Sequence, residues 1–195
     1  MEFKHILLGV GFAFIWASAF PSAKMAVQFC PPFFLLFLRF SFAGLFSILL
    51  GKYLGQNFRF DHKDLLWIAI FGFIQNGLYL GLIFLALTKI DSNISVIIAS
   101  ILPLNVAFFS WLLFKSKMSL LGLSGLVVGL FGVLLIMLQR VEKEYEILGI
   151  TLCLLGLLAT TFSTLIITKI NINKNNILII IGLQMLAGSI FLLPL

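Results

Sequence analysis

The sequence is poor in charge, since only 10% of its 195 residues are Asp, Glu, Lys or Arg. A soluble domain has about a quarter charged residues, and disordered chains are richer still in charge, so both classes are excluded. Two cysteines are too few for a disulfide scaffold. By contrast, 62% of the residues are apolar and the mean hydropathy is +1.18. Because one soluble globule cannot bury that much apolar surface, the composition predicts an integral membrane protein whose first partner is the lipid bilayer.

The apolar residues gather in runs long enough to be membrane-spanning helices, which need about 20 residues each. Transmembrane barrels show alternating segments of about ten residues instead, so the pattern predicts an all-α polytopic fold with about seven spans. The predicted spans are Ile6–Phe29, Pro32–Leu50, Leu65–Leu87, Ile94–Phe114, Leu120–Leu138, Ile147–Thr168 and Ile177–Leu195.

The loops between the spans contain nearly all of the Lys and Arg residues, which sum with the acids to a net charge of +6. Because this charge is spread over several loops and forms no single basic patch, no nucleic-acid partner is expected. Cytoplasmic loops are richer in Lys and Arg. One side holds eight of these residues and the other side four, with Arg39 inside a span set aside. The bias predicts a cytoplasmic N-terminus.

Acidic and metal-binding residues are missing from the predicted spans. All seven Asp and Glu residues lie in loops or at the N-terminus, and the two histidines, His5 and His62, do not have metal-ligand spacing. Without a buried base, no serine or cysteine is activated as a nucleophile. We therefore expect that the protein is not an enzyme and that it binds no cofactor and no metal ion. Within these 195 residues we also expect no carboxylate inside the membrane that could relay protons.

Two prolines lie inside predicted spans, and each removes a backbone donor and kinks its helix. Trp16 and Ser18 lie near Pro21 in span one, and Asn105 lies near Pro103 in span four. A kinked, polar-lined helix pair fits a solute path, although such kinks are also common in membrane helices that line no path. Trp16, Ser18, Pro103 and Asn105 are therefore candidates for a cavity or hinge.

Span three has adjacent amides, Gln75 and Asn76, and Tyr79 lies four residues after Gln75 on the same helical face. Amides are costly at mid-membrane, so a polar cavity is predicted beside them. Thr164 in span six is a further candidate. Ser and Thr hydroxyls in a helix often bond the backbone carbonyl one turn before them. This local bonding is the favoured interpretation for the hydroxyls on one face of span six. These hydroxyls belong to Thr160, Ser163 and Thr164.

Arg39 and Lys24 are the cations within the spans. Arg39 lies roughly 10 Å into its helix at 1.5 Å per residue. It is a candidate for binding anionic or zwitterionic solutes, with bonding to the carbonyls of a neighbouring helix slightly favoured. Lys24 is nearer its helix end, where extension to the membrane interface is expected.

Span five has glycines at spacings of three, four and three residues, which puts Gly122, Gly125, Gly129 and Gly132 on one face. Small residues let membrane helices approach closely. Packing within the chain is the favoured interpretation, and an interface between transporter halves or between protomers is the alternative.

The order of these segments resembles the drug/metabolite transporter superfamily, EamA type. The resemblance rests on Phe14–Phe20 with Lys24, on Pro32–Gly44, and on a block from Ala86 through Ser100–Leu104 to Trp111 and the glycine face. Members usually have an acidic residue just after span four, and Phe114–Lys117 has none. Trp16–Ala26 is weakly echoed by Gly156–Ile166, about five spans later, and an odd number of spans inverts the second copy.

The resemblance implies a ten-span carrier made of two inverted five-helix repeats around a central cavity. Residues 1–139 are then the first repeat, and residues 140–195 are the first two helices of the second. The chain is expected to be a truncated carrier, or to need a partner that supplies three further helices. The implied function is secondary transport of small organic solutes (amino acids, metabolites or drugs) by alternating access, in a bacterial inner membrane. The alternative is a non-transporting membrane subunit or a degenerate remnant.

Overall fold

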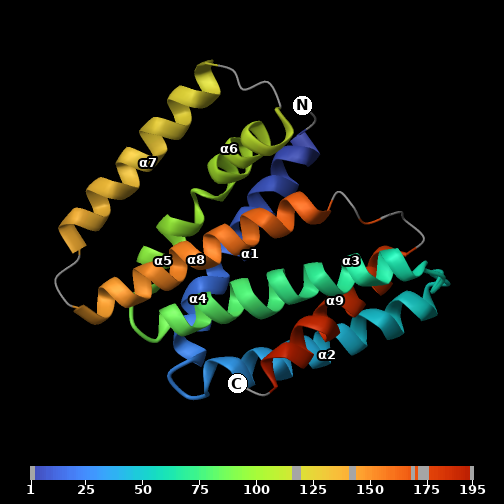
Figure 1. Ribbon diagram of the computed structural model, residues 1–195. Helices are drawn as coiled ribbons and strands as arrows, with labels where there is room; N and C mark the ends of the chain where they lie inside the picture. Colours follow the sequence, from blue (N-terminus) through green and yellow to red (C-terminus); the bar gives the residue numbers. More distant parts are fainter. Residues whose placement is uncertain (1–2, 116–119, 141–143, 168–169, 171–175, 194–195) are drawn as a thin grey trace.

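The computed structural model describes residues 3–115, 120–140, 144–167, 170 and 176–193, and all regular secondary structure in these ranges is helical (Figure 1). In chain order the elements are α1 (Phe3–Ala26), α2 (Pro32–Tyr53), α3 (His62–Gly72), the π-helix η1 (Phe73–Tyr79), α4 (Leu80–Leu87), α5 (Ser92–Ala99), α6 (Leu102–Phe114), α7 (Leu120–Arg140), α8 (Glu144–Ile166) and α9 (Ile177–Leu192).

The all-α prediction is confirmed, since each of the seven predicted runs overlaps at least one of these helices. Five segments are long and apolar enough to cross a membrane: His5–Ala26, Pro32–Tyr53, His62–Leu87, Ser92–Phe114 and Glu146–Ile166. The helix α9 is shorter, with 16 residues, and the 21-residue α7 corresponds to the fifth predicted run.

Several helix ends differ from the prediction. The first helix stops at Ala26 rather than Phe29, and α3 and α8 begin three residues earlier than predicted. As a result, Asp64 lies in the first turn of α3, and Glu144 and Glu146 belong to α8 and not to a loop. A carboxylate is favourable in a first turn because the N-terminal end of a helix has a partial positive charge.

Two predicted spans are not uniform α-helices. The third changes from α3 to the π-helix η1 and back to α4, and the fourth is interrupted at Ser100–Ile101, between α5 and α6. The second interruption lies directly before Pro103, as expected from the helical hydrogen bond that proline cannot make. In contrast, α1 continues as a helix through Pro21.

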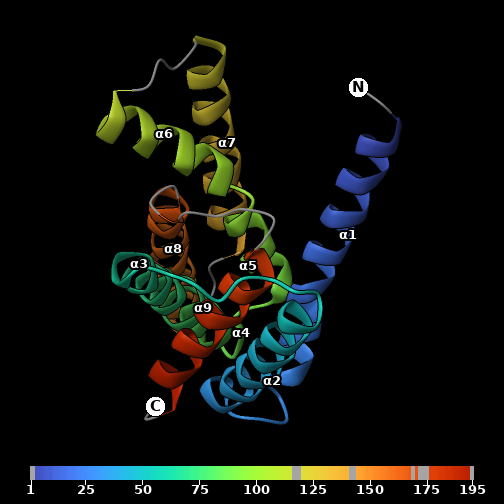
Figure 2. The ribbon, with the colours of Figure 1, turned by 90° about the vertical axis from the view of Figure 1, so that its right-hand side faces the viewer.

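The helix α9 packs closely along α2 and against α3 and η1 (Figures 1 and 2). A Cβ atom added at Gly182 would lie 2.7 Å from the carbonyl oxygen of Gly44, and one added at Gly188 would lie 2.8 Å from that of Gly72. These glycines allow the backbones of α2, α3 and α9 to approach, which is the usual way that membrane helices pack.

Among the five candidate membrane spans, the one formed by α1 is the least buried. Only 11% of its most apolar window is buried, against 50% for the corresponding windows of His62–Leu87 and α8. Figure 2 shows its N-terminal half diverging from the other helices, while its C-terminal half packs through Phe20 and Ala23 into the main apolar core.

Three glycines of the face on α7, Gly125, Gly129 and Gly132, differ in what lies beside them. A Cβ atom at Gly129 would meet Leu104 of α6, whereas Cβ atoms at Gly125 and Gly132 would meet no described atom within 4 Å. Packing within the chain thus uses Gly129, and self-association through the other positions stays a prediction.

Candidate functional site

A cavity of about 210 Å³ opens between α1, α2, η1 and α4. Four of the nine candidate residues line it: Trp16 from α1, Arg39 from α2, and Gln75 and Tyr79 from η1. The rest of its wall is apolar and comes from α1 and α4: Ala19, Phe20, Ala23, Leu80, Ile83, Phe84 and Leu87. The structure therefore brings together polar side chains that are up to 63 positions apart in the sequence.

The π-helix η1 supplies the polar centre of this site. Gln75 and Tyr79 both line the cavity, as their four-residue spacing predicts. Single π turns are rare and are frequent at functional sites, because the wider turn frees backbone and redirects side chains. The sequence analysis missed this π segment, since no residue pattern in Phe73–Tyr79 separates a π turn from an α turn.

Gln75 joins η1 to α8. Its Oε1 atom accepts hydrogen bonds from Thr160 Oγ1 at 3.0 Å and from Ser163 Oγ. The side chains of Thr160 and Ser163 are buried, with exposed fractions of 3% and 0%. The sequence analysis favoured local bonding for these hydroxyls. This is wrong for Thr160, which reaches across to another helix, and only partly right for Ser163, which also bonds the Thr160 carbonyl at 2.9 Å.

Asn76 faces away from the cavity, toward α9. Its Nδ2 atom donates to the carbonyl oxygen of Gln184 at 3.1 Å, and its side chain is 5% exposed. A Cβ atom added at Gly188 would lie 2.5 Å from that of Asn76. The amide of Asn76 therefore fixes a helix–helix contact, and the structure does not place it in the predicted cavity.

Arg39 lines both this cavity and an adjoining hollow of about 270 Å³ that also contains Ser22. Its guanidinium lies 5.8 Å from the centroid of the Phe40 ring. Among the described residues, the guanidinium has no hydrogen bond or ion pair. The slightly favoured expectation, that it bonds carbonyls of a neighbouring helix, is therefore not met in the described part of the chain.

Lys24 has the role that was favoured for Arg39. Its Nζ atom donates to the carbonyl oxygens of Leu87 at 2.8 Å and Ile90 at 2.9 Å, at the C-terminal end of α4. This contact ties the end of α1 to the end of α4, and the expectation that Lys24 extends to the membrane interface stays a prediction. A cation is favourable at the end of α4 because the last carbonyls of a helix lack partners and have a partial negative charge.

The remaining candidates do not line the cavity. Ser18 donates to the carbonyl oxygen of Ile15 at 2.8 Å, and Thr164 donates to that of Thr160 at 2.8 Å. Both are bonds within a helix, as the local interpretation predicted for Thr164. Pro103 and Asn105 lie on α6, exposed and half-buried respectively.

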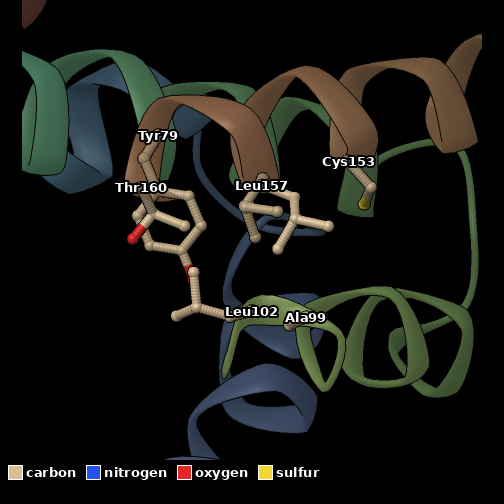
Figure 3. Close-up of a pocket in the computed structure, with 7 residues that line it drawn as sticks. Tyr79, Ala99, Leu102, Cys153, Leu157 and Thr160 are labelled. Atoms are coloured by element: carbon tan, nitrogen blue, oxygen red, sulfur yellow. The ribbon is translucent and has the colours of Figure 1, made fainter. Parts of the chain in front are cut away.

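Tyr79 and Ile83 also border a second space, between η1, α4, α5, α6 and α8 (Figure 3). Figure 3 shows the Tyr79 ring beside Thr160, with its hydroxyl end toward Leu102. This space is too narrow for a water molecule. It is therefore a packing gap, and the cavity at Gln75 and Arg39 is the better candidate for a solute. In the described part of the chain, no cluster of three His, Cys, Asp or Glu residues could hold a metal ion.

Comparison with known proteins gives a family match over most of the chain. The model of the EamA-like transporter family matches residues 3–138. The chain is 24% identical over 92% of its length to the uncharacterized transporter YvbV of Bacillus subtilis. It is 31% identical over 65% of its length to the S-adenosylmethionine/S-adenosylhomocysteine transporter of Chlamydia trachomatis.

The matched relatives are longer than this chain. The alignments cover 58% of the length of YvbV and 38% of the length of the Chlamydia trachomatis transporter. No solved structure matches the chain.

Proposed function

Because this chain belongs to the EamA-like transporter family, we propose that it forms part of a secondary carrier that moves small organic solutes by alternating access. The observation that supports this proposal is the cavity itself. Three helical segments that are distant in the sequence direct Trp16, Arg39 and Gln75 to one space within an otherwise apolar wall. Polar and charged groups are expensive within a membrane, and they mark solute paths when they converge.

The solute class follows from the chemistry of the same wall. Arg39 offers a planar fork of donors that matches a carboxylate, and Trp16 and Tyr79 offer rings that pack against a flat heterocycle. S-adenosylmethionine and S-adenosylhomocysteine, which name a relative that is 31% identical, combine both groups. We take these two compounds as the first candidate solutes.

The architecture of the whole carrier is part of the proposal. Residues 1–139 form a first five-helix repeat, residues 140–195 begin an inverted second repeat, and further helices complete the carrier. A small buried fraction of α1 is consistent with a further helix beside it. The N-terminus lies in the cytoplasm, and the membrane is a bacterial inner membrane.

The test is uptake by proteoliposomes that contain the protein purified from its native membrane, with its intact mass recorded. Labelled S-adenosylhomocysteine is expected to accumulate faster than in protein-free liposomes, and Arg39→Leu should reduce uptake about tenfold or more by removing the anion partner. Val128→Leu, at an exposed position on α7, is the matched control and should transport normally.

A failure of every tested amino-acid, nucleoside and drug solute to accumulate would overturn the carrier proposal. The protein would then be better described as a non-transporting membrane subunit or a degenerate remnant, the second function that the sequence allows. In that case Arg39→Leu and Val128→Leu should not differ in any uptake measurement.

A further inference from the structure

We propose that Thr160 and Ser163 of α8 orient the side-chain amide of Gln75 with its nitrogen toward the cavity, which makes the cavity selective for a solute with a carboxylate or another anionic group. This inference rests on the proposed function, in which the cavity holds the solute. Thr160 and Ser163 are positioning residues in it, because they act through Gln75 and do not line the 210 Å³ cavity themselves.

The orientation of the amide follows from the hydroxyls that contact it. Thr160 Oγ1 lies 3.0 Å from Gln75 Oε1 and makes no other hydrogen bond in the described part of the chain. Ser163 Oγ contacts the same oxygen. A hydroxyl has one proton to donate, and the proton of Thr160 has no other acceptor among the described residues, so it is donated to the amide oxygen. The proton of Ser163 has two acceptors in reach, this amide oxygen and the Thr160 carbonyl, so Thr160 is the stronger constraint on the orientation. Because its oxygen faces α8, the polar group that Gln75 offers to the cavity is its NH₂ group.

The polar side chains of the cavity are then mostly donors. The indole of Trp16 and the guanidinium of Arg39 can only donate, Gln75 donates in the orientation set by α8, and Tyr79 can donate or accept. No carboxylate lines the cavity. An anionic acceptor would pair with several of these donors at once. A cation would find no side chain of opposite charge.

The first experiment measures whether the cavity attracts anions more than cations, and it does not depend on transport. The protein used as the parent for all variants contains Trp67→Phe and Trp111→Phe, which leaves Trp16 as the tryptophan of these 195 residues. This parent is placed in nanodiscs of zwitterionic lipid. Fluorescence quenching of Trp16 is measured with iodide and with caesium. With each constant divided by the value for N-acetyltryptophanamide in the same buffer, we expect the quenching constant of iodide to exceed that of caesium about threefold or more, since a donor-lined cavity concentrates anions.

Substitutions in the same parent then separate an effect of the Gln75 amide orientation from a general change in the structure. Gln75→Glu keeps the oxygen that accepts from Thr160 and adds a negative charge, so it should abolish the iodide preference. Thr160→Val removes the hydroxyl at constant shape and should lower the preference about twofold, while Thr160→Ser restores it. Thr151→Val is the matched control on α8, because Thr151 is exposed and bonds the Ile147 carbonyl at 2.8 Å in its own helix.

Equal quenching by iodide and caesium in the parent, or an unchanged preference in Thr160→Val, would overturn the inference. Uptake separates this failure from failure of the proposed function. S-adenosylhomocysteine should compete with its own labelled form about tenfold better than its methyl ester does, and Thr160→Val should raise KM with little change in kcat. If nothing is transported but the iodide preference is present and depends on Thr160, the carrier proposal fails and the inference about the cavity stands.

Discussion

At the scale of single residues, neighbouring polar side chains in the third span have different partners. Gln75 accepts hydrogen bonds from α8 and lines the cavity, whereas Asn76 donates to the backbone of α9. The sequence predicts that two amides at mid-membrane need polar partners, because burying them unpaired is unfavourable. It does not predict which amide faces a helix and which faces a cavity, since that depends on where α8 and α9 pack.

We expect Asn76→Leu to destabilise the protein by about 1–3 kcal/mol, because it removes the buried hydrogen bond between η1 and the Gln184 carbonyl and adds bulk beside Gly188. Unfolding by SDS in mixed micelles measures the loss. Asn105→Leu, a half-buried amide on α6, is the control and should change stability little. An equal loss in both variants would mean that the bond to Gln184 contributes nothing specific.

Lys24→Met should also lower stability, by about 1.5–3 kcal/mol before screening by solvent, since it removes two charge-assisted hydrogen bonds to the end of α4. The half-buried position of Lys24 makes the lower end of that range the expected value. The same SDS titration measures it, with Lys63→Met at an exposed site as the control. A null result for Lys24→Met would contradict a stabilising role for this contact.

At the scale of elements, small residues decide which helices approach closely. The glycines of α2, α3 and α9 allow backbone contacts between helices, while of Gly125, Gly129 and Gly132 on α7 only Gly129 has a described atom close to its Cβ position. The sequence analysis singled out α7 because its glycines follow a regular spacing. Spacing alone cannot show which face meets another helix, since Gly44, Ser47 and Gly51 of α2 have the same three- and four-residue spacing and do pack against α9.

Gly182→Ala is expected to weaken the docking of α9, because its Cβ atom would lie 2.5 Å from Ile48 Cγ1 and 2.7 Å from the Gly44 carbonyl oxygen. Gly11→Ala in α1 is the matched control. Its Cβ atom would meet nothing within 4 Å, and alanine favours a helix by about 1 kcal/mol over glycine. Thermal unfolding should therefore show a lower Tm for Gly182→Ala and an unchanged or higher Tm for Gly11→Ala. The reverse order would refute the close contact between α2 and α9.

At the scale of the whole molecule, the orientation in the membrane is a prediction from the loop charges. The two cysteines offer a test, since both are thiols without a disulfide, with Cys30 half-buried after α1 and Cys153 fully buried in α8. With a cytoplasmic N-terminus, Cys30 lies on the outer side.

A membrane-impermeant maleimide added to intact cells should therefore label the protein through Cys30. Cys30→Ser should abolish the labelling, because Cys153 is 0% exposed. Labelling that requires permeabilised cells would place the N-terminus outside and reverse the predicted orientation.

The sequence by itself determined that this protein is an all-α membrane protein and where most of its helices lie. Apolar runs of about 20 residues have few alternatives in a bilayer, because every backbone donor and acceptor must be satisfied within the segment. It also determined that Gln75, Tyr79, Trp16 and Arg39 need polar surroundings, since their chemistry is costly in lipid.

Only the tertiary structure decided which of these side chains meet. The packing of α8 on η1 gives Gln75 a hydrogen bond with Thr160. The packing of α9 gives Asn76 a carbonyl partner, and the contact of α1 with the end of α4 does the same for Lys24. Arg39 was left facing the cavity with no hydrogen-bond partner among the described residues. These outcomes depend on contacts between segments that are 63 to 108 positions apart, for which local sequence holds no signal.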